Sequence, residues 1–302
     1  MTENGKVWLV TGASSGFGRA IAEAAVAAGD TVILASTRTR RGSASRRAQY
    51  RPLTASGTAR RPEALADLVA AHPDRVEAIG LDVTDGGRID AVAADVLARY
   101  GRVDVLVNNA GRTQVGAFEE TTDRELRDLF ELHVFGPARL TRVLLPQMRE
   151  RGSGSIVNMS SFGGRLSFAG FSPYSATKAA LEQLSQGLAD EVAPFGIKVL
   201  IVEPGAFRTN LFGKDAAHLS QEHPAYAEKV GATRRAVRGG HGTQPGDPAK
   251  AAAIRLALDA ENTPLRFALG SDALDSLVGH LDSVRAELAA WEKVSRGTDF
   301  DR

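Results

Sequence analysis

The stretch Thr11–Gly18, which reads TGASSGFG, decides the fold. It follows the short apolar run Val7–Val10 and opens into Arg19–Glu23, which has helical character. Glycines in such a turn let the backbone bend tightly and approach a pyrophosphate closely. The N–H groups and the positive dipole end of the following helix favour the same anion. A turn that merely connects strand to helix is the alternative, but the strand-turn-helix context favours a nucleotide-phosphate site.

Apolar runs of strand length alternate along the chain with longer amphipathic segments of helical period, which is typical of βαβ units. The predicted strands are 6–10, 31–35, 76–81, 103–107, 154–159, 198–202 and 266–269. The predicted helices cover about 16–28, 62–71, 86–99, 123–150, 173–194, 248–259 and 272–293. We therefore expect an α/β fold with a doubly wound, mostly parallel seven-stranded sheet and helices on both faces, which is a Rossmann fold.

Two stretches depart from this regular pattern. Residues 39–58 are rich in Arg, Ser, Thr and Ala, show no apolar period, and stand where a short connection is normal. We interpret them as an inserted basic loop. Residues 210–245 mix Gly, His and charged residues with weak helical character. They follow the last central strand at the carboxyl edge of the sheet, where open α/β sheets bind ligands, and we interpret them as a substrate lid.

The composition favours one globular domain. The chain has 302 residues, which one α/β domain can fill, so residues 1–302 are expected to form a single dinucleotide-binding unit. It contains no cysteine, which excludes disulfides, thiolate metal sites and a cysteine nucleophile. The net charge of +1 gives no overall attraction to nucleic acid or to anionic membranes. Eight arginines within residues 31–62 are a local exception, but Tyr50 is the one aromatic residue among them, which argues against nucleic-acid binding.

The polar start Met1–Lys6 is followed by an apolar run too short for a signal peptide or a membrane span, so a cytoplasmic protein is expected. His218, Glu222 and His223 stand close together, but none of the histidines shows the paired helical spacing of a metal site. We expect no metal.

Further sequence blocks follow the turn in a fixed order. They are LDVTD at 81–85, NNAG at 108–111, Ser161 with Tyr174-x-x-x-Lys178, and Pro204-Gly205 followed by Thr209. Together with TGxxxGxG, these blocks resemble the short-chain dehydrogenase/reductase family over about residues 5–210, apart from the arginine-rich insert. The resemblance implies an NAD(P)-dependent oxidoreductase that acts on CH–OH or C=O groups.

The resemblance also implies a role for each block. The three glycines of the turn would hold the pyrophosphate, Asp82 and Val83 would lie at the adenine, Asn108–Gly111 would steady the central strand, and Thr209 would contact the carboxamide. From the residues alone, Asp82 could equally be a helix cap or turn acid, and Asn108-Asn109 could be a strand-ending turn. The expected cofactor-binding residues are Gly12, Ser14, Ser15, Gly16, Phe17, Gly18, Arg38, Asp82, Val83, Asn109, Ala110, Gly111, Tyr174, Lys178, Pro204, Gly205 and Thr209.

The end of the second strand distinguishes NAD from NADP. An acid there would bind a ribose 2′-OH and repel a 2′-phosphate, whereas an arginine would do the reverse. The sequence runs Leu34-Ala35-Ser36-Thr37-Arg38 without an acid, which favours NADP(H) while NAD(H) remains an alternative. Arg38 is the first candidate for the phosphate because it follows the strand directly, and Arg60, beyond the insert, is the second.

Tyr174 and Lys178 stand four residues apart at the start of a predicted helix, so both side chains share one face. A free tyrosine is a poor base at neutral pH, but a neighbouring ammonium is expected to lower its pKa. General acid/base catalysis by Tyr174 then becomes possible. By resemblance, Lys178 also bonds the nicotinamide ribose, and Ser161, rather than Ser160, hydrogen-bonds the substrate oxygen.

His133 stands where the family usually has an asparagine credited with holding a helix distortion and a water behind the lysine. Histidine can donate and accept hydrogen bonds, and its charge can change near neutral pH, so it could give the proton relay a different pH dependence or impair it. Alternatively, His133 simply caps local backbone groups.

The leading function is thus an oxidoreductase, and the alternative is a cofactor-sensing binding protein or regulator with weak or lost catalysis. Apolar residues around the expected site favour a small apolar substrate, although they could equally belong to the core: Phe162, Leu166, Phe168, Phe171, Phe207, Leu211 and Phe212. By resemblance, the helices at 123–150 and 173–194 would pair between subunits in a homodimer or homotetramer.

Overall fold

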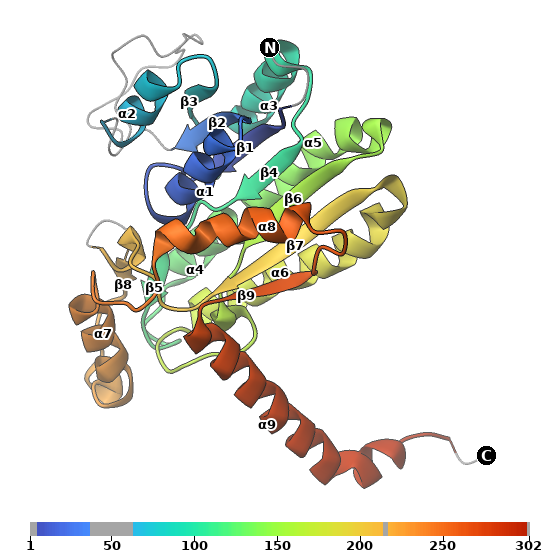
Figure 1. Ribbon diagram of the computed structural model, residues 1–302. Coiled ribbons are helices and arrows are strands. Elements are labelled where there is room, and N and C mark those ends of the chain that lie inside the picture. Colours follow the sequence, from blue (N-terminus) through green and yellow to red (C-terminus); the bar gives the residue numbers. More distant parts are fainter. Residues whose placement is uncertain (1–4, 37–62, 214–216, 301–302) are drawn as a thin grey trace.

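A computed structural model describes residues 5–36, 63–213 and 217–300. Within them, one sheet has seven parallel strands in the order β3-β2-β1-β4-β6-β7-β9 (Figure 1). The strands are β1 (Val7–Thr11), β2 (Thr31–Ser36), β3 (Val76–Gly80), β4 (Val105–Asn108), β6 (Gly154–Met159), β7 (Ile197–Pro204) and β9 (Arg266–Leu269). All seven predicted strands are confirmed. The strand order reverses between β1 and β4, which is where open α/β sheets form their ligand crevice.

Helices cover both faces of the sheet, as the apolar alternation predicts. On one face, α1 (Gly16–Ala27), α2 (Glu63–Ala71) and α8 (Ala253–Asp259) share a core with side chains such as Trp8 and Val10. On the other face, α3 (Gly86–Tyr100), α5 (Gly136–Arg151) and α6 (Ser172–Val192) pack on Leu9 and Leu106. Successive strand residues point to opposite faces, so strands covered on both sides are apolar throughout.

The predicted helix 123–150 is wrong in one respect, because it is not a single α-helix. It consists of α4 (Asp123–Phe130), a π-helical turn at Glu131–Phe135, and α5. α4 begins with a capping box in which Thr122 and Glu125 satisfy each other's backbone N–H groups. The wider π-helical turn that follows contains His133, whose side chain is buried.

The predicted lid contains more regular structure than its sequence suggests. β8 (Ala217–Leu219) pairs in parallel with β5 (Thr113–Val115) in a second, two-stranded sheet, and α7 (Lys229–Gly239) follows. Neither short strand was predicted, since three-residue strands leave no periodic signal. The predicted insert at 39–58, together with Arg38 and Arg60, lies outside the described residues.

The helix α9 (Ser271–Arg296) follows β9 and projects away from the rest of the fold (Figure 1). In the part of the chain that the structure describes, we find no helix with the length and apolarity needed to cross a membrane.

Candidate active site

The glycine turn lies against the end of β4. Asn109 Nδ2 donates to the carbonyl oxygens of Thr11 (2.9 Å) and Gly12 (3.1 Å), so it joins the ends of two neighbouring strands. A Cβ on Gly12 would lie 2.8 Å from Ala110 Cα, and one on Gly18 would lie 2.6 Å from Asn109 Nδ2. Such distances are shorter than van der Waals contact, so both positions require glycine. The NNAG block therefore packs directly on the turn.

The start of α1 suits an anionic group. Ser15 is its N-cap residue and makes no side-chain cap hydrogen bond, and the first turn contains no acid. The first N–H groups of a helix and its dipole attract a phosphate, and the close backbone packing of Gly12 and Gly18 leaves the turn free of side chains at these points. The turn thus fits the pyrophosphate of a dinucleotide.

The loop after β7 closes the other side of this turn. The rings of Phe17 and Phe207 lie 4.9 Å apart, and Gly16, with φ +56°, would bring a Cβ within 3.0 Å of the Thr209 side chain. Thr209 therefore lies beside the predicted turn, and Pro204 and Gly205 stand at the end of β7, at the carboxyl edge of the sheet.

Asp82 and Val83 follow β3 at the same edge. Asp82 Oδ1 accepts hydrogen bonds from the backbone N (3.0 Å) and the hydroxyl (2.7 Å) of Thr84, whereas the N-cap of α3 is Asp85. Asp82 is thus a turn acid and not a helix cap. Its side chain is exposed, and Val83 is buried.

Ser161 and Tyr174 meet at the end of β6. Ser161 Oγ accepts from Gly163 N (3.1 Å), and Ser161 lies close enough to Tyr174 to affect its ionisation. Burial raises the pKa of Tyr174 to about 12, and Ser161 opposes that rise. The phenol therefore stays protonated at neutral pH in this arrangement.

Lys178 lies one turn further along α6. Its Nζ donates to Met159 O (2.8 Å) and is 5.7 Å from the centroid of the Tyr174 ring. Burial lowers the pKa of Lys178 to about 8, while Glu182 opposes the shift. The expectation that the Lys178 ammonium lowers the pKa of Tyr174 is wrong for this geometry, because burial dominates and the shift has the opposite sign.

His133 lies behind this pair and has two defined partners. Arg112 N donates to Nε2 (3.2 Å), so the proton of the neutral ring is on Nδ1, which lies 2.8 Å from Thr177 Oγ1. Thr177 Oγ1 in turn donates to Tyr174 O (2.7 Å). Burial, assisted by the positive charges of Lys178 and Arg112, holds the pKa of His133 well below its usual value.

This arrangement corrects the expectation that His133 changes charge near neutral pH. The ring stays neutral there. Its Nε2 accepts from a backbone N–H, as the alternative interpretation predicts, whereas its Nδ1 bonds the hydroxyl of Thr177. The ring also stands edge-on to Tyr174, with centroids 5.7 Å apart. His133 is therefore a packing and hydrogen-bonding residue behind Tyr174.

A pair of buried carboxyl groups near the site was missed in the sequence. Glu182 is fully buried and accepts from Ser160 Oγ (2.6 Å), and Glu203, at 3% exposure, lies close enough to Glu182 to affect its own ionisation while its Oε1 has no hydrogen-bond partner. Burial and the proximity of Glu182 raise the pKa of Glu203 to about 7, against the opposing charges of Arg165 and Arg266. The two acids are 21 positions apart on different elements, so no spacing rule could have found them.

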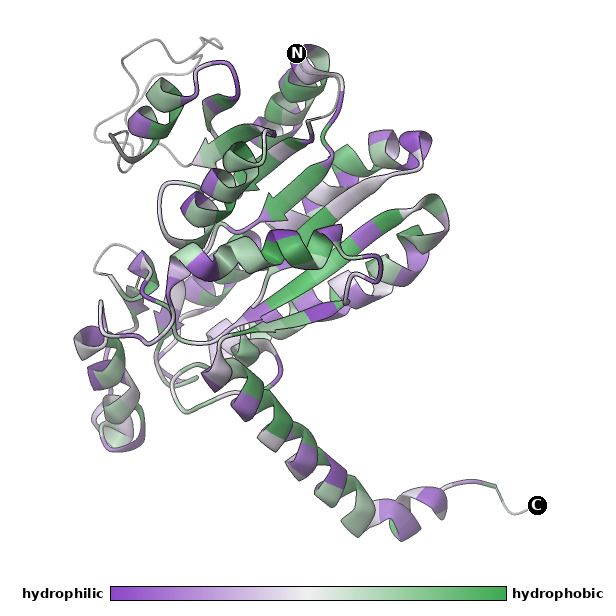
Figure 2. Cartoon of the chain, viewed as in Figure 1, coloured by the Kyte–Doolittle hydropathy of each residue, from purple (hydrophilic) through white to green (hydrophobic). Residues whose placement is uncertain are grey.

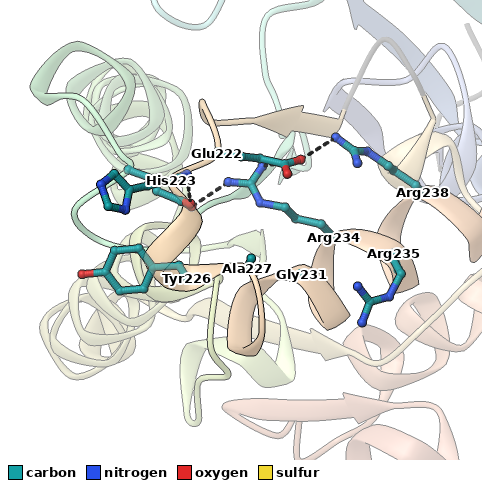
Figure 3. A pocket seen from close by; sticks show the side chains of 9 residues that line it. Glu222, His223, Tyr226, Ala227, Gly231, Arg234, Arg235 and Arg238 are labelled. Atoms are coloured by element: carbon teal, nitrogen blue, oxygen red, sulfur yellow. Dashed lines mark hydrogen bonds and ion pairs between the residues drawn. The ribbon is translucent and has the colours of Figure 1, made fainter.

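The predicted lid, residues 210–245, makes buried polar contacts with the rest of the fold. Arg234 on α7 donates to Glu120 Oε2 (2.6 Å) and to Ser220 O (2.8 Å), and both charged residues are buried. His218 bonds Glu125, and Glu222 pairs with Arg238. Figure 3 shows these arginines lining a pocket on α7 that shares no residue with the site around Tyr174.

The predicted blocks thus lie along one edge of the sheet, while Arg38 is outside the described residues. A family model described as short chain dehydrogenase matches residues 44–220 of the chain. The chain belongs to the short-chain dehydrogenase family. It is an NAD(P)-dependent oxidoreductase that acts on CH–OH and C=O groups.

Three known proteins resemble this short-chain dehydrogenase over most of its length. A short-chain dehydrogenase structure from Streptomyces avermitilis is 77% identical, covers 99% of this chain and 100% of its own, and has a TM-score of 0.86. The oxidoreductase BOA17 of Botryotinia fuckeliana (strain B05.10) is 34% identical over 292 residues, which are 96% of this chain and 98% of that protein. A short-chain dehydrogenase/reductase from Burkholderia phymatum in complex with NAD is 23% identical, with a TM-score of 0.76 and coverage of 95% and 96%, and shows likeness of fold alone.

Proposed function

We propose that this short-chain dehydrogenase is an NADP(H)-dependent enzyme that transfers hydride between nicotinamide and a carbonyl or secondary alcohol, with Tyr174 as the acid/base. The observation that carries the proposal is the cluster of Ser161, Tyr174 and Lys178 at the sheet edge that also holds the glycine turn. The cofactor, when bound, supplies or accepts the hydride at its nicotinamide ring.

The protonation of Tyr174 favours the reductive direction. Because the pKa of Tyr174 is raised to about 12, its hydroxyl carries a proton that it can give to a carbonyl oxygen. Ser161 accepts from Gly163 N and keeps its own proton for the same oxygen. The buried ammonium of Lys178 lies 5.7 Å from the centroid of the ring, where its charge partly offsets the effect of burial on the phenolate left after the transfer.

Replacement of Tyr174 tests this role. The Tyr174→Phe variant keeps the ring and loses only the hydroxyl, so we expect NADPH consumption with ketones, aldehydes and quinones to fall at least about 100-fold, as for loss of a general acid. Binding of NADPH, followed by fluorescence, should remain within about threefold of the unaltered protein. Unchanged turnover in Tyr174→Phe would refute the assignment. NADPH binding without turnover by the unaltered protein would favour the cofactor-sensing alternative instead.

The preference for NADP(H) rests on the absence of an acid after β2 and on Arg38. Catalytic efficiency with both cofactors tests it, and a preference for NAD(H) would contradict it. We expect Arg38→Ala to lose about tenfold or more with NADPH and little with NADH, since a phosphate contact is a charge-assisted hydrogen bond. Arg60→Ala tests the second candidate, and Arg46→Ala, within the insert, is the matched control.

The substrate is proposed to be small and largely apolar. The ring of Phe171 lies 6.0 Å from that of Tyr174, and Phe162 and Phe168 lie 5.8 Å apart, with Phe168 half exposed. Residues 210–245 would cover these aromatic side chains as a lid.

We also propose that the protein is a homodimer or homotetramer that pairs through the helices of 123–150 and 173–194. A cytoplasmic location likewise stays a proposal.

A further inference from the structure

The first turns of the helix α9 pack on the rest of the fold, whereas its remaining turns do not. Ala273 and Leu277 are buried against the fold, and Asp272 Oδ2 accepts from Ala206 N (2.7 Å) in the loop after β7. From Leu281 to Phe300, by contrast, every residue is exposed. The helix therefore extends for several turns beyond the last residue that packs on the body (Figure 1).

An apolar stripe runs along this extended helix. Its residues alternate in spacing by three and four positions, and we name them the α9 stripe: Leu274, Leu277, Leu281, Val284, Leu288 and Trp291. This is the a/d spacing of a helix that packs against another helix. Leu288 and Trp291 are 69% and 62% exposed, although side chains of this size are normally buried. Apolar and polar residues alternate along the projecting part of α9 in Figure 2.

The charges of α9 argue against a membrane as the occupant of the stripe. The helix carries five acids and three bases, so its net charge is −2 without its histidine. Amphipathic helices that lie on anionic bilayers are instead rich in Lys and Arg on the polar face. A protein helix of similar shape is therefore the better occupant.

We propose that the α9 stripe binds the α9 stripe of a second copy of this chain, with the two helices antiparallel about a two-fold axis. In this register, Leu281 packs on Val284 of the second copy, and Leu274 packs on its Trp291. The flanking positions then place His280 beside Glu287 of the second copy, twice by symmetry. The contact is self-complementary, as a two-fold interface requires.

Charge selects this arrangement over its alternatives. A parallel pair would set Glu287 opposite Glu292, and a one-heptad shift of the antiparallel pair toward the C-terminal end would set Arg285 against Arg285 and Glu287 against Glu287. The opposite shift would centre the contact near Leu277, which is buried against its own fold. Like charges in these flanking positions oppose pairing. The stripe spans Leu274–Trp291, about 25 Å of helix. Because Leu277 is already buried against its own fold, the paired area falls below the roughly 1,000 Å² of a stable interface, so association should be weak and depend on concentration.

Sedimentation of the full chain over about a hundredfold range of concentration tests the pairing. The variant Leu281→Asp/Leu288→Asp places charges in the stripe, and we expect its mass at high concentration to be half that of the unaltered chain. Ala286→Asp is the matched control, because position 286 points away from the stripe, and it should retain the full mass. Cofactor binding and circular dichroism establish that each variant is folded.

The absence of cysteine allows a second test of the geometry. Chains with Leu281→Cys and chains with Val284→Cys should form disulfides when mixed, and faster than either alone. Preferential cross-linking within a single variant would indicate parallel helices and overturn the antiparallel pairing. A chain that stays monomeric throughout, or that keeps its full mass with both aspartates, would overturn the proposal, as would binding of α9 to phosphatidylcholine vesicles without self-association.

Discussion

His133 shows how a single residue gains a fixed role through its neighbours. A lone histidine in sequence suggests a group that titrates near neutral pH. In the folded chain its two nitrogens are committed to Arg112 N and Thr177 Oγ1, and burial keeps it neutral. The same contacts connect it to the backbone of Tyr174, so we expect it to hold this proposed acid/base in place without exchanging protons.

We therefore expect His133→Asn to leave the pH dependence of kcat/KM unchanged in shape between about pH 6 and 8, where an ordinary histidine titrates. Activity itself should fall modestly, because the smaller side chain loosens the packing beside Tyr174. Steady-state rates across this range, with the unaltered protein as reference, measure both effects. A shift of the apparent pKa by about one unit would show that His133 does exchange protons.

Glu203 gives the stability of the protein a pH dependence. Its pKa is raised to about 7 in the fold, so the folded state favours the neutral acid. The stabilisation is complete below the unfolded pKa of about 4.3 and is lost as the pH rises through about 7. The free energy of unfolding should therefore fall as the pH rises across this interval.

The variant Glu203→Gln cannot ionise and should lose this part of the slope, so that it gains stability over the unaltered chain at about pH 8. Urea unfolding of both proteins at about pH 5 and pH 8 isolates Glu203, because all other titrating groups are common to them. Equal slopes for the two proteins would contradict the raised pKa.

At the scale of elements, the glycine turn is fixed by the contact between β1, α1 and β4. Gly18 lies so close to Gly12 O and Asn109 Nδ2 that a Cβ would be 2.6 Å from each. The backbone oxygen cannot move aside without disturbing β1. The sequence motif is thus as much a packing requirement between elements as a phosphate contact.

We expect Gly18→Ala to weaken NADPH binding about tenfold or more and to lower the free energy of unfolding by about 1–3 kcal/mol, as overpacking does. Gly187→Ala on α6 is the matched control, because a Cβ there meets nothing within 4 Å and helical alanine is favoured over glycine. Titration calorimetry and urea unfolding measure the two quantities. Normal cofactor binding by Gly18→Ala would show that the turn can relax.

On the scale of the whole molecule, the outer part of α9 contains no buried residue. Every described residue after His280 is exposed, so this part adds no apolar burial to the body. Removal of residues 282–302 should therefore leave NADPH affinity unchanged within about twofold. The unfolding midpoint at low protein concentration should also be unchanged, which scanning fluorimetry measures. Loss of the fold in this shortened chain would show that the outer helix supports the body.

The sequence by itself determined the seven strands, the doubly wound class and the blocks of the site. Strand and helix periods are local, and the residues Gly12, Tyr174 and Lys178 belong to motifs with fixed spacing, so each can be recognised without its neighbours. The carboxyl ends of parallel strands meet at one edge, which brings the blocks together once the strands are assigned.

Only the tertiary structure decided how those residues are charged and supported. The sign of the Tyr174 pKa shift, the neutral state of His133 and the Glu182–Glu203 pair all depend on burial and on partners distant in sequence. The π-helical turn and the pairing of β5 with β8 likewise arise from contacts between elements. Local patterns fix which elements form, whereas desolvation and proximity, which determine charge, exist only when the chain is folded.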